Sequence, residues 1–444
     1  MADSKFKIQN SKNKSIEDQI PKTEDRRPIQ NPQSAICNPQ SRVWIVSELY
    51  YPEETSTGYY ITRTAEGLAD EFDMNVLCGQ PTYSARGRRA PSKETHKNVK
   101  IKRCVGTTLD KNVIVFKLVN ILTLTLSIFF NAVFRFKKGD TVMVVTTPPS
   151  LPFITAIACF LKRAKYILLI HDNYPEIAIA SKMVKPGSFI VRVMQRLNRF
   201  LYKRAWRIIV VGRDMKVLLE KKIGKEDEKI FTIPNWAELE TVHPLPRDEN
   251  PLLEELNLKD KFVLLYAGNM GYPNDIESII ESAEQLKEKR GIHFLFLGAG
   301  VKRRWLEKAV KERKLENVTL LNPKPRSEQT VFLNACDVGF VSLVSGMWGV
   351  SMPSRTYNLL AAGKPMIALT DAGSEIEMVL NDDSVGWSIP PSAPDKLTEI
   401  VLEAYSKREE FAEISGRARQ AALEKYSLDA ALDKYRKVFT TDEK

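Results

Sequence analysis

The segment from Pro353 to Pro365 carries the residues best suited to chemistry, in the order Pro-Ser-Arg-Thr-Tyr-Asn-Leu-Leu-Ala-Ala-Gly-Lys-Pro. This order predicts a Pro-Ser turn that caps a short apolar helix, which Gly-Lys-Pro ends before a strand at 366–370. In a parallel sheet, such a helix points free backbone N–H groups and a positive dipole end at the carboxyl edge, where phosphates bind. Arg355 adds a positive charge in the first turn. The alternative is an ordinary strand–loop–helix unit.

The composition is that of a soluble enzyme with an anionic partner. A chain of 444 residues with 43% hydrophobic content predicts two domains with ordinary cores. The net charge of +11 is accompanied by no RNA- or DNA-binding motif, so nucleotide or phospholipid is favoured over nucleic acid. Five cysteines without a Cys-x-x-Cys pair suit a reducing cytosol, and four scattered histidines argue against a multi-histidine metal site.

Residues 1–41 form a polar segment rich in Lys, Asn, Gln, Ser and Pro. The segment lacks apolar periodicity, so we expect a disordered tail. It contains no apolar core of a signal peptide. One hypothesis is that translation begins near Val43.

From residue 42 the chain alternates strands and helices in two series. The apolar runs are continuous, as strands buried on both faces of a parallel sheet require. A Pro-rich linker at 243–251 separates the series. We expect an α/β fold of two Rossmann-like, doubly wound domains, 42–240 and 241–425, facing a cleft, and a helix in 426–444 that packs back on the first domain. The expected strands are 43–49, 74–78, 100–105, 141–146, 165–171, 207–211 and 229–233, then 262–267, 293–297, 318–321, 338–343, 366–370 and 387–389.

The segment from Val113 to Phe134 is long and apolar enough to span a bilayer. It lies between two strands of one expected sheet, however, and spanning would pull that sheet apart. We expect a crossover helix whose outer face enters the membrane interface while basic flanks meet anionic lipid; the alternative is a plain crossover helix. The helix carries a polar stripe of Lys117, Asn120, Thr123, Ser127 and Asn131, and its basic flanks are Arg103, Lys111, Arg135, Lys137 and Lys138.

Several short motifs occur in the order and spacing of one enzyme family. Over residues 42–440 the chain resembles the retaining GT-B glycosyltransferases of family four. The segment from His171 to Glu176 resembles the Asp-x-x-Pro-Glu sequence of a subgroup that builds bacterial polysaccharides on lipid carriers, and 230–236 matches the Ile-Pro-Asn entrance to the linker. In the second half the matching segments are 265–271, 296–300, 335–338 and 353–365.

The resemblance implies a mechanism. The bond from the sugar's anomeric carbon to a nucleoside diphosphate breaks, and negative charge develops on the β-phosphate. Preorganised dipoles and cations must stabilise that charge. The resemblance implies that no metal or other cofactor is needed, and no convincing Asp-x-Asp motif is present. The departing phosphate would help to deprotonate the acceptor, so the protein mainly positions the reactants.

The resemblance assigns site residues in both halves. Gly58 would let the first loop approach the diphosphate, and His171 would lie near the transferred sugar; the alternatives are a helix-entry turn and a buried histidine. Asp172 and Glu176 would bind or deprotonate acceptor hydroxyls, or cap the helix after Pro175. Gly268, Gly298 and Gly300 would bring backbone close to the nucleotide, and close packing of strand and helix is the alternative.

Two features depart from the family pattern. The usual Arg and Lys of the phosphate clamp are replaced by Asn269 and Asn274, and the places of the usual E-x7-E pair hold Val350 and Asn358. We therefore expect Arg355 to take over part of the charge role, with Ser354 completing the phosphate cradle. Further candidates for donor binding are Lys324 and Arg326, and those for the missing carboxylate are Glu375 and Glu377.

The resemblance predicts a metal-independent hexosyltransferase that uses a nucleotide sugar and a polyprenyl-linked saccharide in cell-surface polysaccharide synthesis. It would be cytoplasmic and peripheral on the inner face of the cell membrane. Two other classes stay open. One is an epimerase or hydrolase of nucleotide sugars with the same fold, and the other is a non-catalytic nucleotide-sugar-binding scaffold.

Overall fold

The computed structural model describes residues 41–81, 89–109 and 113–440. The expected disordered tail, apart from its last residue, and the flanking Lys111 lie outside the described residues. The tail therefore stays a prediction.

The first sheet has eight strands in the order β3-β4-β2-β1-β5-β6-β7-β8. Its pairs are parallel except β3 with β4. The prediction missed β3. Strand β1 ends at Val46 rather than at residue 49, because the Ser47 hydroxyl hydrogen-bonds to the backbone of Leu49 in a tight turn. The strands are β1 Arg42–Val46, β2 Asp73–Cys78, β3 Lys93–His96, β4 Val99–Arg103, β5 Thr141–Val145, β6 Lys165–Ile170, β7 Arg207–Val210 and β8 Ile230–Thr232.

The second sheet has six parallel strands in the order β11-β10-β9-β12-β13-β14. Chain order reverses between β9 and β12, and doubly wound sheets bind ligands beyond the carboxyl ends of strands at such a switch point. Segments 268–275 and 343–354 follow these two strands. The strands are β9 Phe262–Ala267, β10 Ile292–Leu297, β11 Val318–Leu321, β12 Val338–Ser342, β13 Met366–Leu369 and β14 Gly386–Ile389.

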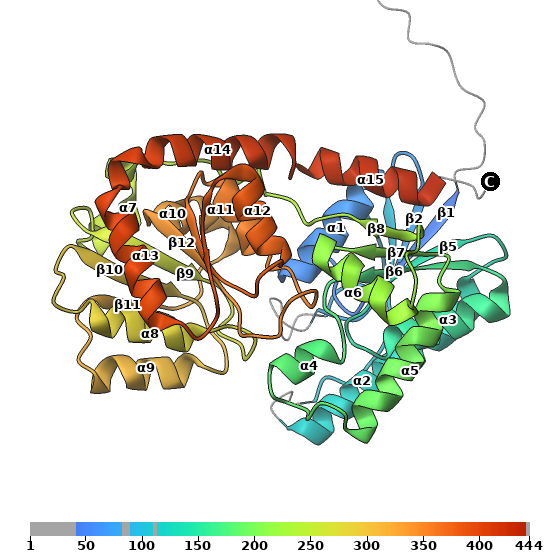
Figure 1. Cartoon of the computed structure of the whole chain (residues 1–444). Coiled ribbons are helices and arrows are strands. Elements are labelled where there is room, and N and C mark those ends of the chain that lie inside the picture. The colour runs from blue at the N-terminus through green and yellow to red at the C-terminus, as the bar shows by residue number, and fades with distance from the viewer. Residues whose placement is uncertain (1–40, 82–88, 110–112, 441–444) are drawn as a thin grey trace, which may run out of the picture. The chain divides into compact units, whose positions relative to one another are not determined.

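Helices cover both faces of each sheet (Figure 1). The predicted fold of two Rossmann-like domains is therefore confirmed. In the first domain the helices are α1 Ser56–Leu68, α2 Ile114–Arg135, α3 Leu151–Lys162, α4 Glu176–Ala180, α5 Phe189–Arg204 and α6 Arg213–Ile223. The later helices are α7 Pro251–Glu255, α8 Ile276–Gln285, α9 Arg303–Glu312, α10 Gln329–Asn334, α11 Arg355–Ala361, α12 Glu375–Asp383, α13 Pro394–Ser406, α14 Phe411–Glu424 and α15 Leu428–Thr440.

The last helix, α15, belongs with the first domain. It packs on α1 and adds Leu432, Tyr435 and Phe439 to the apolar core that also contains Ile45 and Met74. This core, on one face of the first sheet, gains a large apolar area that the first domain alone does not supply. The end of the chain thus ties the second domain to the first.

Helix α2 is a crossover helix between β4 and β5 of one sheet. Its stretch Leu118–Arg135 is long and apolar enough to cross a membrane by length and composition, but Leu124, Ile128 and Ala132 are buried in the core. The expectation that Arg103 serves as a basic flank was wrong. Arg103 is fully buried and donates to Glu94 at 2.6 Å.

Candidate functional site

Arg355 lies at the centre of a cluster formed by three segments at the switch point. Its guanidinium lies 4.5 Å from the centre of the Tyr266 ring, and its Nη2 donates to the side-chain oxygen of Asn274 at 3.3 Å. A Cβ placed on Gly268 would lie 3.1 Å from the guanidinium carbon. The Nη1 atom of Arg355 is buried and has no hydrogen-bond partner among the described residues. The cluster therefore presents a fixed positive charge with an unused donor.

The glycines beside Arg355 allow two loops to approach each other. A Cβ on Gly298 would lie 2.0 Å from the carbonyl oxygen of Gly268, and both residues have φ near +145° (147° and 145°). A Cβ on Gly300 would lie 2.5 Å from the carbonyl oxygen of Met270. The loop after β10 must therefore lack side chains here for the loop after β9 to reach Arg355. Close packing of the two loops is thus sufficient to require glycine at 298 and 300, and their approach to a nucleotide stays a prediction.

The two asparagines that replace the usual clamp bond to one another. The side-chain nitrogen of Asn274 donates to the backbone oxygen of Asn269 at 3.1 Å, and this orients the other amide atom toward Arg355. Lys302, which the sequence analysis missed, donates to the backbone oxygen of Asn274 at 2.7 Å and pairs with Glu277 at 2.8 Å. Its place two residues after Gly300 was the available signal. Lys302 supports the position of Asn274.

The first domain approaches this cluster through the start of α1. The hydroxyls of Ser56 and Ser354 are hydrogen-bonded at 2.8 Å. Within the described part of the chain, Ser354 caps no backbone N–H of α11, although the sequence predicts a Pro-Ser cap. Helix α11 has seven residues, so the positive charge at this place belongs to Arg355 rather than to a long helix dipole. Gly58 is buried in the first turn of α1, where a Cβ would lie 2.9 Å from the carbonyl oxygen of Glu53.

His171 and Asp172 follow β6, and the chain at Asp172 and Asn173 contacts the loop after β12. Asp172 forms an antiparallel bridge with Ser351, and the backbone N–H of Asn173 donates to the Val350 oxygen at 2.8 Å. Burial lowers the pKa of His171 to about 4, so its imidazole is neutral near pH 7. Burial also raises the pKa of Asp172, although a hydrogen bond with Ser351 opposes the shift. The backbone of Val350, at one place of the absent glutamate pair, therefore contacts the loop after β6.

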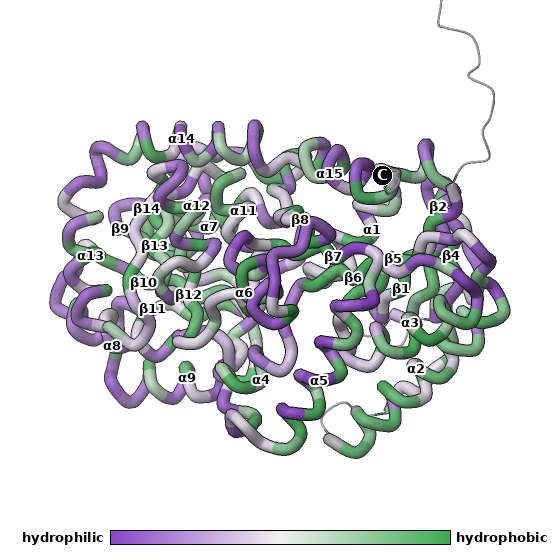
Figure 2. The backbone as a smooth tube through the Cα atoms, turned by 45° about the vertical axis from the view of Figure 1, so that its right-hand side comes forward, coloured by the Kyte–Doolittle hydropathy of each residue, from purple (hydrophilic) through white to green (hydrophobic). Residues whose placement is uncertain are grey.

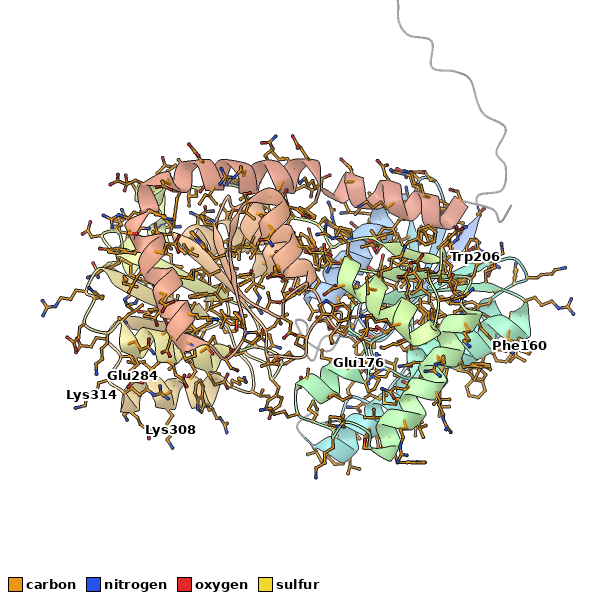
Figure 3. The ribbon with its side chains drawn as sticks, in the orientation of Figure 1. Phe160, Glu176, Trp206, Glu284, Lys308 and Lys314 are labelled. Carbon is orange, nitrogen blue, oxygen red and sulfur yellow. The ribbon has the colours of Figure 1, made fainter. Side chains whose placement is uncertain are left out.

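The three candidate glutamates have partners within the protein. Glu176, at the start of α4 (Figure 3), pairs with Lys222 of α6, with 2.7 Å between Nζ and Oε2. Glu375 is buried and accepts from the backbone N–H and the Nε of Arg213 at 2.6 and 3.0 Å. Glu377 accepts from the backbone N–H of Gly373 at 2.6 Å, at the start of its own helix. Each carboxylate thus forms an ion pair or stabilises a helix start.

The two basic candidates after β11 also have protein partners. Lys324 pairs with Glu328 at 2.8 Å. Arg326 lies 3.8 Å over the Tyr59 ring and binds both oxygens of buried Glu238 at 2.5 and 2.8 Å. The side-chain nitrogen of Asn358 donates to the same glutamate at 2.7 Å. Glu238, another residue that the sequence analysis missed, therefore connects the segment before the linker to Asn358, at the other place of the absent pair.

Metal-binding side chains do not gather in the described part of the chain. No group of three or more His, Cys, Asp or Glu side chains there is placed to hold a metal ion. The cationic group that the site offers a ligand is the guanidinium of Arg355. This arrangement suits an anion with several oxygen acceptors, such as a phosphate.

Each of the two domains matches a family of known proteins. The family described as "Glycosyl transferases group 1" matches residues 249–421, and "Glycosyltransferase Family 4" matches residues 57–241. The chain is 28% identical over 404 residues to "Probable glycosyltransferase WbjE" of Pseudomonas aeruginosa, with 89% of this chain and 96% of that protein covered. It is 26% identical over 373 residues to "Putative colanic acid biosynthesis glycosyl transferase WcaI" of Escherichia coli (strain K12), with 80% and 90% covered.

A solved structure shows the same fold. Alr3699/HepE of Anabaena, in complex with UDP and glucose, superposes with a TM-score of 0.68. The alignment covers 90% of this chain and 99% of that protein at 13% identity. At this identity the likeness concerns the fold alone.

Proposed function

Because its two domains are those of a glycosyltransferase with the GT-B fold, we propose that this protein transfers a hexose from a nucleotide sugar to a polyprenyl-linked saccharide. The transfer retains anomeric configuration and takes place on the cytoplasmic face of the membrane. Its product contributes to cell-surface polysaccharide. The description of WcaI as a putative colanic acid biosynthesis glycosyl transferase supports the polysaccharide product. The UDP and glucose bound by Alr3699/HepE support a nucleotide-sugar donor.

The unpaired Nη1 of Arg355 is the observation that carries the proposal. A buried cationic donor without a partner is costly, and a diphosphate oxygen would satisfy it. Negative charge grows on the β-phosphate as the glycosidic bond breaks, so this donor would bind the transition state more strongly than the ground state. Asn274 and Tyr266 hold the guanidinium in place before the donor arrives.

His171 and Asp172 would act on the sugar side of the reaction. A neutral imidazole can accept or donate one hydrogen bond to a sugar hydroxyl without placing a second charge beside the diphosphate. Asp172, whose pKa is raised by burial, is suited to accept a proton from an acceptor hydroxyl. Glu176 would reach an acceptor only after leaving Lys222.

Arg355 and the backbone N–H groups would carry the charge stabilisation that a metal ion supplies in other transferases. We therefore expect activity to persist after treatment with EDTA. A loss of activity that Mg²⁺ or Mn²⁺ restores would contradict a metal-independent reaction.

The central experiment has two stages. Thermal shift with a panel of nucleotide sugars identifies the donor, because a ligand of the native state raises the melting temperature by mass action. Release of nucleotide is then measured with and without polyprenyl-linked saccharide, and NMR of the product gives the anomeric configuration. The proposal predicts acceptor-dependent release with retention. Release without acceptor would instead favour an epimerase or hydrolase, and binding without turnover would favour a scaffold.

A further inference from the structure

Three neighbouring helices of the first domain expose large apolar side chains. Helix α2 packs on α3, and α3 packs on α5. Figure 2 shows extended hydrophobic stretches in α2 and α3, and Figure 3 shows Phe160 on the outside of α3. The exposed side chains of these three helices are Val115, Phe116, Leu118, Leu122, Leu126, Phe130 and Phe134, then Ile157, Phe160 and Leu161, and finally Phe189, Ile190, Val193, Leu197 and Phe200.

Helix α5 combines this apolar surface with positive charge. Phe189, Val193, Leu197 and Phe200 recur at intervals of three or four residues and form one stripe, while Val191, Leu201 and Tyr202 anchor the opposite face in the core. A basic stripe runs beside the apolar one, one residue earlier in the chain. Its members are Arg192, Arg196, Arg199 and Lys203, all exposed, and α5 contains no acidic residue.

The edges of α5 extend the same pattern. Met183, in the loop before α5, is 68% exposed and lies between exposed Lys182 and Lys185. At the other end, the guanidinium of Arg204 lies 4.7 Å over the Phe200 ring. A cation held over an exposed aromatic ring can keep its charge at the headgroup level while the ring enters the apolar layer.

Two members of the polar stripe of α2 bond to the segment before the helix, and the side chain of Lys117 lies outside the described residues. The side chains of Asn120 and Thr123 hydrogen-bond to Thr107, and Asn120 also bonds the backbone of Leu109. The segment before α2 thus satisfies polar groups that would be costly to place in lipid. The exposed part of α2 is left mainly apolar.

We propose that α2, α3 and α5 together form one membrane-binding surface for an anionic lipid bilayer, with α5 as its basic element. From the sequence, α2 alone is expected to meet the membrane. A continuous apolar area on three helices requires a partner. A second copy of the chain would set basic α5 against basic α5 across a two-fold axis, whereas anionic headgroups complement the charge.

Vesicle sedimentation with the full chain tests this surface without any donor, so its failure is distinct from failure of the proposed reaction. The probes are phosphatidylcholine vesicles with and without phosphatidylglycerol. We expect strong binding to the anionic vesicles and weak binding to the neutral ones. Each basic residue near an anionic surface strengthens binding about fivefold, so Arg192→Gln, Arg196→Gln and Lys203→Gln combined should weaken it roughly a hundredfold.

An apolar variant and a matched control complete the test. Phe160→Ser, Phe189→Ser and Phe200→Ser combined should abolish binding. All three rings are exposed, so we expect an unchanged melting temperature, which shows that the variant folds. Lys308→Gln, Lys311→Gln and Lys396→Gln remove the same charge from exposed sites in the second domain and should leave binding intact; Figure 3 shows Lys308 there. The proposal would be overturned if the basic and apolar variants bound vesicles as strongly as the control variant. It would also be overturned by a dimer that forms without lipid and that the apolar substitutions dissociate.

Discussion

The two domains share a layered construction but differ on their outer surfaces. In the first domain, α2, α3 and α5 expose apolar side chains at helical spacing. Among the described residues of the second domain, the exposed large apolar side chains are few and scattered: Tyr272, Val301, Trp305, Leu402 and Leu423. Burial dictates the inner faces of both sheets in the same way, so only the outer faces are free to diverge. Fold alone therefore does not determine which surface a partner meets.

The two domains also bring different chemistry to the site. The second domain supplies the cationic Arg355 with Asn274 and its close glycine loops, whereas the first supplies the neutral Ser56 and His171. A leaving group that gains negative charge needs the former, and an uncharged sugar suits the latter. The comparison thus predicts which substitutions alter stability, turnover or pH dependence.

The largest effect should distinguish the inner side of α2 from its outer side. Ile128 is fully buried, so Ile128→Ala should lower the free energy of unfolding by about 2–5 kcal/mol through lost burial and a cavity. Leu122 is 58% exposed, and Leu122→Ala should change it by less than about 0.5 kcal/mol. Urea denaturation measures both. Equal losses would mean that the outer face of α2 is covered.

The second effect concerns the positive charge of Arg355 at the switch point of the second sheet. Arg355→Ala should raise the barrier to donor turnover by roughly 2–4 kcal/mol, because the leaving diphosphate loses its cationic donor. Steady-state kinetics with the identified donor gives this number. Arg313→Ala, which removes an arginine paired with Glu284 on the same domain, is the matched control and should leave kcat unchanged. Full activity of Arg355→Ala would remove Arg355 from the mechanism.

The third effect separates two basic residues that the sequence placed together. Arg326→Ala leaves Glu238 buried without its cation and should cost about 2–3 kcal/mol of stability, less than for a fully buried pair because Arg326 is 19% exposed. Lys324→Ala breaks a surface pair and should cost at most about 1 kcal/mol. Thermal and urea unfolding report both costs. If Arg326→Ala kept its stability but lost donor binding, the expected donor-binding role would be supported instead.

The sequence predicted the fold well because the strands and helices can be recognised from local patterns of residues. Buried parallel strands appear as continuous apolar runs, and most expected strands lie within a few residues of the observed ones. Strand β3 was missed because Lys-Glu-Thr-His carries no apolar run. Partners at the site depend on residues far apart in the chain: Arg355 meets Asn274 across 81 residues, and Glu375 meets Arg213 across 162. The local pattern could indicate Arg355 as a site residue, but it could not predict that Glu375 pairs with Arg213.

The smallest predicted effect compares one histidine from each domain. Burial lowers the pKa of both His171 and His293 from 6.5 to about 4, so the native state favours the neutral imidazole. As pH falls through 6.5 the unfolded chain takes up protons that the native chain refuses, and stability is lost between pH 6.5 and about 4. His171→Gln and His293→Gln should each reduce this loss by on the order of 1–2 kcal/mol.

Activity should then separate the two histidines. His293 hydrogen-bonds Thr319 at 2.8 Å inside the second sheet, so His293→Gln should alter the pH dependence of unfolding and leave turnover intact. His171→Gln should alter the pH dependence of unfolding and also lower turnover, since His171 follows β6 directly before Asp172, which bridges to Ser351 in the loop after β12. Neither histidine should titrate in the kcat profile near pH 6.5. An inflection there that His171→Gln abolishes would show that the pKa of His171 is not lowered, and the neutral imidazole would lose its place in the mechanism.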